Sequence, residues 1–198
     1  GIPLEWTIMG NGSDDILQMI CKGFLESGKK AIAPYPSYTL YETLARISGA
    51  DMVYRDFNPD YSLSDEFFRE KADVFFIPNP NSPSGTEISM DQIKSLLQAN
   101  PDSCVVLDEA YVDFSDQPNK SVSLLKDFDN LIIVRTFSKA YSLAGMRIGF
   151  GISRPPIINI LNKVKDSYNC DRISIKAASL VFDFIDEFQK NIEKIKKS

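Results

Sequence analysis

The lysine that could do chemistry is Lys139, which ends the segment Thr136-Phe-Ser-Lys directly after the apolar run 131–134. If such a lysine is partly buried at the end of a strand, burial lowers its pKa from about 10.4 and supplies the neutral amine that a Schiff base requires. A single lysine in a soluble protein is far more often a solvated surface residue. Lys139 is therefore a candidate nucleophile only together with the residues around it.

A carboxylate follows another apolar run in the same way. Asp108 comes directly after residues 104–107, so we expect it at the mouth of a buried strand. An ionised carboxylate buried there without a partner is strongly unfavourable, so it needs a cation, a metal ion or a proton. A helix cap or an internal ion pair would satisfy it, and so would the protonated nitrogen of a pyridine ring.

Two glycine-containing segments could bind a ligand through their backbone. Gly10-Asn-Gly-Ser-Asp14 precedes a predicted helix, where free N–H groups and the helix dipole favour an anion, although Gly-Ser also forms ordinary turns and caps. Residues 78–85 are rich in turn formers. They form either a plain loop or one with a cis proline that holds side chains near a ligand.

The composition excludes several kinds of site. Histidine is absent, which removes Ser-His-Asp triads, Cys-His pairs and histidine zinc sites. Three cysteines without a C-x-x-C pair indicate buried thiols in a reducing cytoplasm, and no metal site is expected. A net charge of −5 argues against nucleic acid or an anionic membrane as partner. No apolar stretch approaches the roughly 20 residues of a membrane span, and no signal peptide is visible.

The elements that must position these residues alternate along the chain. Short apolar runs occupy 31–33, 52–54, 74–77, 104–107, 131–134 and 148–152, and helix patterns cover 14–27, 89–100, a stretch from Pro155 or Pro156 through Val164, and a stretch from about Ile175 with a possible break near 183–186. This alternation predicts a three-layer α/β/α fold with a mostly parallel central sheet. Ligands of such sheets collect outside the carboxyl ends of the strands, where the polar segments above begin.

Read in order, these segments resemble the fold-type I pyridoxal-phosphate (PLP) aminotransferases of class I and II, and most closely their histidinol-phosphate branch. The most specific match is residues 134–149, which resemble the segment of that family that carries the lysine. Asp108-Glu-Ala-Tyr111 is similar to the family's Asp-x-x-Tyr segment, and residues 166–172 are similar to a stretch typical of the histidinol-phosphate branch.

The resemblance implies a role for each matching residue. Lys139 would form the Schiff base with PLP and move a proton, Asp108 would pair with the ring nitrogen, and Tyr111 would hydrogen-bond the ring hydroxyl. The ring would stack on Tyr38. The phosphate would be bound by backbone amides and by side chains: Gly12, Ser13 and Asp14 for the amides, and Thr136, Ser138 and Arg147 for the side chains.

One position departs from the family pattern. The usual Asn-Pro-Thr-Gly segment contacts the ring hydroxyl through its asparagine, but here that position is Ser82. The contact is then lost, mediated by water, or taken over by Asn81. The cofactor assignment does not depend on this contact.

The resemblance also implies a domain organisation. Residues 1–185 would be the PLP-binding large domain, and residues 186–198 the start of a connector helix to a small C-terminal domain. Family members also have an N-terminal arm, and they form homodimers whose active sites lie at the interface. We expect this chain to be a truncated core that self-associates.

The expected reaction is transamination of histidinol phosphate with 2-oxoglutarate to imidazole-acetol phosphate and glutamate, in histidine biosynthesis. The partners are then small amino and oxo acids, and the truncated core alone is expected to be inactive. The alternatives are a PLP-dependent decarboxylase of a phosphorylated amino acid and a non-catalytic PLP-fold binding module. A nucleotide-binding domain ranks last because no G-x-G-x-x-G or P-loop motif follows a strand.

Overall fold

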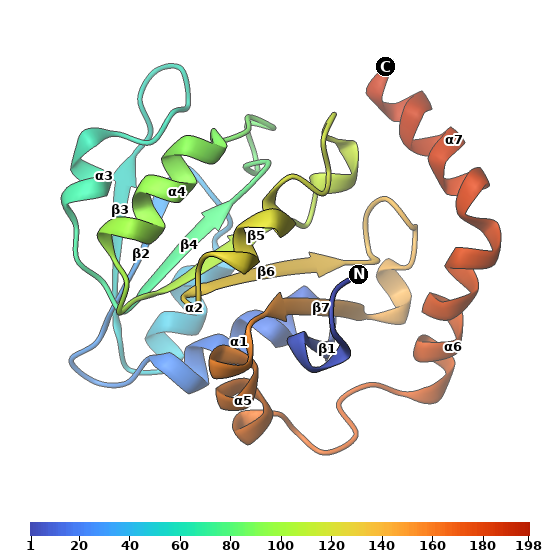
Figure 1. Cartoon of the computed structure of the whole chain (residues 1–198), viewed down its shortest axis with the longest axis horizontal. Coiled ribbons are helices and arrows are strands. Elements are labelled where there is room, and N and C mark those ends of the chain that lie inside the picture. The colour runs from blue at the N-terminus through green and yellow to red at the C-terminus, as the bar shows by residue number, and fades with distance from the viewer.

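A seven-stranded sheet lies between two layers of helices in the computed structural model, which describes residues 1–198 (Figure 1). The strands, in spatial order, are β1 (Thr7–Asn11), β7 (Ile148–Ser153), β6 (Leu131–Thr136), β5 (Cys104–Asp108), β4 (Val74–Pro78), β2 (Lys30–Tyr35) and β3 (Asp51–Asp56). Strand β7 is antiparallel to both of its neighbours, and the pairs from β6 to β3 are all parallel. The predicted mostly parallel α/β/α fold is confirmed.

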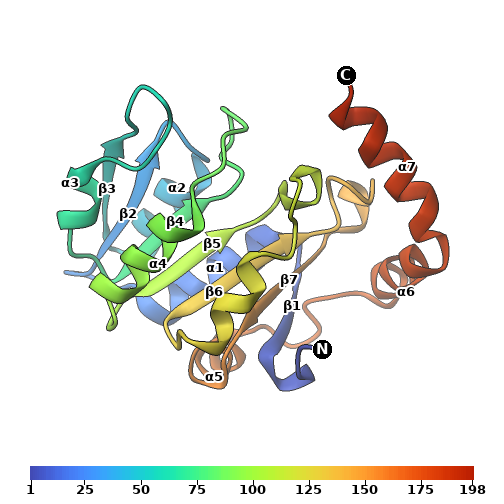
Figure 2. The same ribbon diagram turned by 45° about the horizontal axis from the view of Figure 1, so that its top comes forward.

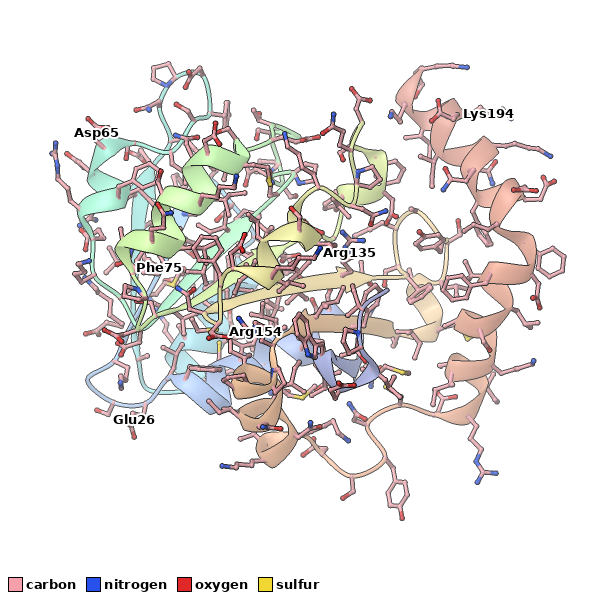
Figure 3. The ribbon with its side chains drawn as sticks, in the orientation of Figure 1. Glu26, Asp65, Phe75, Arg135, Arg154 and Lys194 are labelled. Carbon is pink, nitrogen blue, oxygen red and sulfur yellow. The ribbon has the colours of Figure 1, made fainter.

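The side chains of the central strands point alternately into two hydrophobic clusters. On one face, α1 (Ser13–Phe24), α2 (Leu40–Ile47) and α5 (Pro155–Val164) pack against residues such as Phe76 and Val106. On the other face, α3 (Asp65–Arg69), α4 (Met90–Ala99) and the 3-10 segment η3 (Ser121–Lys126) pack against Phe75 and Val105. Phe75 is labelled in Figure 3. Both faces are covered, which explains why these strands read as continuous apolar runs.

The remaining helices extend beside the sheet rather than over it. Helix α6 (Arg172–Leu180), η5 (Val181–Phe184) and α7 (Ile185–Lys196) run along the side of the molecule next to β6 and β7, and the chain ends at the tip of α7 (Figure 2). The break predicted near 183–186 is present as η5, a 3-10 segment. No helix in the chain combines the length and apolar character required to cross a bilayer.

Local signals explain most element boundaries. The Ser89 hydroxyl accepts a hydrogen bond from the Gln92 amide at 3.2 Å and caps α4, as the spacing predicts. Helix α6 begins at Arg172, three residues earlier than expected, because the carboxylate of Asp171 caps it by accepting from Ile173 and Ser174. Short 3-10 segments, η1 (Leu4–Trp6), η2 (Val112–Phe114) and η4 (Ala144–Met146), complete the chain.

Candidate active site

One pocket opens at the carboxyl ends of β4, β5 and β6 and at the N-terminus of α1, and it encloses about 150 Å³. Ten of the twelve residues expected in the site line it: Ser13, Asp14, Tyr38, Ser82, Asp108, Tyr111, Thr136, Ser138, Lys139 and Arg147. Gly12 and Asn81 lie behind its wall. Four further residues, Tyr41, Pro78, Pro80 and Ala110, complete the lining.

Asp108 is the buried carboxylate of this pocket. It is 6% exposed at the end of β5, and no lysine or arginine lies within ion-pair distance of it. Its oxygens accept hydrogen bonds from the Tyr41 hydroxyl at 2.7 Å and from the Ala110 amide at 3.2 Å. Burial raises the pKa of Asp108, and these two hydrogen bonds oppose the rise. The internal ion pair considered from the sequence is therefore not what satisfies Asp108.

Lys139 lies across the pocket in the turn that follows β6. Its Nζ is 5.1 Å from the centroid of the Tyr111 ring. The turn is held by Thr136, whose Oγ1 lies 2.9 Å from Ser138 Oγ and accepts from the Ser138 amide at 3.1 Å. The expectation that Lys139 is partly buried is wrong, because its side chain is exposed at the mouth of an open pocket.

The start of α1 forms a cup suited to an anion. Gly12 is the N-cap residue with φ 85°, and the first-turn amides of a helix have no partner within the helix. The amides of Ser13 and Asp14 are therefore available to bind an anion. Gly12 differs from the expectation, because its amide already donates to the Gly10 carbonyl at 2.8 Å.

Gly12 has a steric role instead. A Cβ atom at this position would collide with the guanidinium of Arg147. Arg147 donates to the Asp14 carboxylate at 3.1 Å and to the Ala144 carbonyl at 3.3 Å. Its backbone is left-handed, with φ 49°, which a residue other than glycine rarely adopts without a constraint. The arginine is held over the helix N-terminus because only a glycine there leaves room for it.

The aromatic wall of the pocket comes from the segment after β2. The Tyr38 hydroxyl donates to the Asp14 carboxylate at 3.3 Å, and the Tyr38 ring meets the Tyr41 ring edge to face at 5.6 Å. Tyr41 was not predicted as a site residue. It lies three residues after Tyr38, in the first turn of α2, and this closeness in sequence was the available signal.

The loop after β4 distinguishes Asn81 from Ser82. The Asn81 amide group donates to the Pro36 carbonyl at 3.2 Å and to Ser84 Oγ at 2.8 Å. These hydrogen bonds stabilise the loop. Ser82 lines the pocket instead. The Asn79–Pro80 and Ser82–Pro83 peptide bonds are both cis.

Together these groups match a ligand that has an anion at one end and a protonated ring nitrogen at the other. The α1 amides, two hydroxyls and Arg147 provide donors and positive charge for a phosphate. Asp108 provides a buried carboxylate without a cation, and Lys139 provides an amine in the same pocket. The residues present therefore fit PLP.

Comparison with known proteins identifies the family. A model of the family described as "Aminotransferase class I and II" matches residues 5–198. The chain is 46% identical over 178 residues to a histidinol-phosphate aminotransferase of Rhodopirellula baltica, covering 88% of this chain and 48% of that protein. It is 39% identical over 201 residues to histidinol-phosphate aminotransferase 1 of Trichormus variabilis, covering 100% of this chain and 56% of that protein.

Solved structures agree with the fold. The crystal structure of histidinol-phosphate aminotransferase from Sinorhizobium meliloti in complex with pyridoxal-5'-phosphate has a TM-score of 0.89 at 28% identity, covering 98% of this chain and 55% of that one. L-threonine-O-3-phosphate decarboxylase from Porphyromonas gingivalis has a TM-score of 0.83 at 24% identity, covering 96% and 60%, a likeness of fold alone. The chain spans about half the length of the curated relatives it matches. It belongs to the class I and II aminotransferase family.

Proposed function

We propose that this chain is the PLP-binding part of an aminotransferase that converts histidinol phosphate and 2-oxoglutarate to imidazole-acetol phosphate and glutamate. The observation that carries the proposal is the pocket, which combines Lys139, Asp108 and the phosphate donors at one edge of the sheet. The substrate is proposed from the curated relatives, since the two reported above, at 46% and 39% identity, are both histidinol-phosphate aminotransferases.

When bound, PLP supplies an electron sink that stabilises negative charge at the α-carbon of the substrate. Lys139 would bond covalently to the cofactor, and its Nζ would move the proton at the substrate α-carbon. Asp108 would hold the proton on the ring nitrogen, because its buried carboxylate has no other cation. Tyr111 would donate to the ring hydroxyl, and Tyr38 would cover one face of the ring. Ser82 lines the pocket and Asn81 does not, which supports Ser82 as the residue of its loop that would face the cofactor.

The α1 amides and nearby side chains would hold the phosphate group. Ser13 and Asp14 would donate their amides, Thr136 and Ser138 their hydroxyls, and Arg147 its guanidinium. Arg147 already lies beside the N-terminus of α1. Binding therefore requires little movement of the protein, and this pre-organisation favours affinity.

The domain and assembly proposals follow the family resemblance. Residues 1–185 form the large domain and residues 186–198 begin the connector to a small domain, a division supported by the start of α7 at Ile185. The enzyme is proposed to act as a cytoplasmic homodimer.

A substrate comparison tests this function. The full-length protein that contains this segment is incubated with 2-oxoglutarate and histidinol phosphate, and glutamate is measured. A parallel reaction with phosphothreonine is monitored for carbon dioxide. Glutamate formation that depends on histidinol phosphate is expected, whereas release of carbon dioxide without glutamate would replace the aminotransferase with the decarboxylase.

A further inference from the structure

Tyr41 lies directly against the carboxylate of Asp108. Its side chain extends from α2 and is completely buried, with 0% exposed. Its hydroxyl donates to Oδ2 of Asp108 with 2.7 Å between the oxygens, across 67 residues of sequence. Because burying a hydroxyl is favourable only when it finds a partner, this contact accounts for a polar atom inside an otherwise apolar cluster.

The packing around Tyr41 fixes where this hydroxyl can point. The Tyr41 ring stacks on Phe76 with 4.6 Å between the centroids and 5° between the planes. The Tyr38 ring meets it edge to face at 86°. A ring held between two others cannot turn its hydroxyl away from Asp108 without disturbing the cluster.

We infer that Tyr41 positions Asp108 for the cofactor: its fixed hydroxyl holds one carboxylate oxygen and leaves the remaining lone pairs for the protonated ring nitrogen. The inference rests on the proposed function, because Asp108 matters in this way only if PLP binds. Tyr41 lines the same pocket, but it acts through Asp108 and is a positioning residue.

The charges around Asp108 predict a pH effect. The titratable groups that face it come from α1, from the segments after β2, β5 and β6, and from α2: Asp14, Tyr38, Glu109, Lys139 and Tyr41. Burial raises the pKa of Asp108 most, Asp14 raises it further, and the Tyr41 hydrogen bond lowers it. Removing the Tyr41 hydroxyl should therefore raise this pKa, so that the carboxylate is lost at a higher pH as the solution is acidified.

The test is Tyr41→Phe in the 198-residue chain, with PLP binding measured by absorption titration at a series of pH values. Phenylalanine keeps the ring and its stacking, so the fold should persist. We expect PLP affinity to fall about fivefold at neutral pH. The acidic limb, which is the loss of PLP affinity on the acidic side of the pH profile, should move to higher pH. Tyr54→Phe is the matched control, because it removes a hydroxyl from a half-buried tyrosine on β3 that does not contact Asp108.

A double variant separates positioning from packing. In an Asp108→Asn background, adding Tyr41→Phe should weaken PLP binding by less than about twofold, because the carboxylate through which Tyr41 acts is gone. A further fivefold loss in that background would overturn the inference. An acidic limb that does not move in Tyr41→Phe, although the wild-type chain binds PLP, would also overturn the inference. This outcome would leave the proposed function intact.

A measurement on the unmodified chain covers the case in which Tyr41→Phe does not fold. Carbon NMR of the cofactor-free chain should show the Tyr41 ring carbon that bears the hydroxyl shifting with the same midpoint as the Asp108 carboxyl carbon. Independent titration of the two carbons would overturn the inference. If the wild-type chain bound no PLP at all, the proposed function would fail, and this inference with it.

Discussion

At the scale of single residues, the pocket combines groups that are unfavourable without a ligand. Asp108 is buried without a cation, and Arg147 has a left-handed backbone beside Gly12. Strain and unpaired charge of this kind concentrate where a protein binds or reacts, because the bound ligand compensates for them. The stability of the cofactor-free chain should therefore improve when Asp108 is replaced by an uncharged residue.

Asp108→Asn tests this trade-off through its pH dependence. Burial raises the Asp108 pKa above its unfolded value of about 3.9, so the folded state binds more protons and stability falls as pH rises through that window. Asparagine keeps an oxygen for Tyr41 but carries no charge. We expect Asp108→Asn to raise the urea midpoint of the cofactor-free chain at pH 7, with little change at about pH 3. Asp102→Asn, at an exposed aspartate, should leave the urea midpoint unchanged at both pH values. Equal midpoints for Asp108→Asn and the wild type at pH 7 would contradict the expectation that the buried charge destabilises the cofactor-free chain.

The same substitution should have the opposite effect on activity. Under the proposed function, Asp108→Asn removes the anion that would keep the ring nitrogen protonated, so turnover of the enzyme should fall by about 100-fold or more, with a smaller loss of PLP affinity. Steady-state kinetics with histidinol phosphate give the measurement. Near-normal turnover would show that Asp108 does not have this role.

Two glycines with the same φ separate steric from conformational effects. Gly12 and Gly28 both have φ 85°, but a Cβ at Gly12 would collide with Arg147, whereas one at Gly28 meets nothing within 4 Å. Both alanine variants should be destabilised through backbone strain, and Gly12→Ala by about 1–3 kcal/mol, because its φ 85° and ψ 168° lie in a region that only glycine adopts readily. Only Gly12→Ala should also lose most of its PLP affinity, because it displaces the arginine. Equal PLP affinity in the two variants would contradict the proposed role of Arg147.

At the scale of elements, an ion pair anchors the segment that follows β5. Glu109, with 1% of its side chain exposed, binds Arg135 of β6 at 2.7 Å and also accepts from the Ser121 hydroxyl of η3. The same arginine donates to the Pro118 carbonyl at 2.6 Å. This network connects the end of β5 with β6 and η3, at the residue that follows Asp108 in the sequence.

Breaking this pair should be costly. Arg135→Met leaves Glu109 buried without its partner, so we expect a loss of about 3–5 kcal/mol in unfolding free energy. Lys190→Met, which breaks an exposed pair with Glu187, should cost less than about 1 kcal/mol. Urea denaturation compares the two variants, and a similar small loss in both would show that the buried network does not support the fold.

The sequence predicted the elements that packing marks clearly. Strands β2 to β7 are recognisable as apolar runs because helices cover both faces of the sheet. Strand β1 was missed because it is an edge strand in which buried and exposed residues alternate and which contains Gly10 and Asn11. Helices α2 and α3 were missed because they are only 8 and 5 residues long, too short for a hydrophobic period to be read with confidence from sequence.

The site was predictable for a related reason. The carboxyl ends of neighbouring parallel strands meet at one edge, so residues directly after apolar runs, such as Asp108 and Thr136, had to converge. What the pattern could not give were contacts set by tertiary packing: the Tyr41–Asp108 hydrogen bond, the commitment of the Gly12 amide to Gly10, and the exposure of Lys139.

At the scale of the whole molecule, α6, η5 and α7 carry exposed apolar residues beside the sheet. Ile173 is 73% exposed and Phe184 is 59% exposed. Apolar surface grouped in this way favours association. We expect the chain to self-associate in sedimentation experiments, and Ile173→Ser combined with Phe184→Ser to reduce this. Leu4→Ser, at an exposed leucine on η1, is the control, and equal self-association in all three proteins would exclude these helices as the contact.

The most direct test of the central claim is to locate the covalent bond to the cofactor. The 198-residue chain is incubated with PLP, reduced with borohydride, digested and mapped by mass spectrometry. The account predicts one phosphopyridoxyl label, on Lys139, and none on Lys139→Ala although that variant remains folded. Labelling of a different lysine in the wild-type chain, or undiminished labelling of Lys139→Ala, would contradict it.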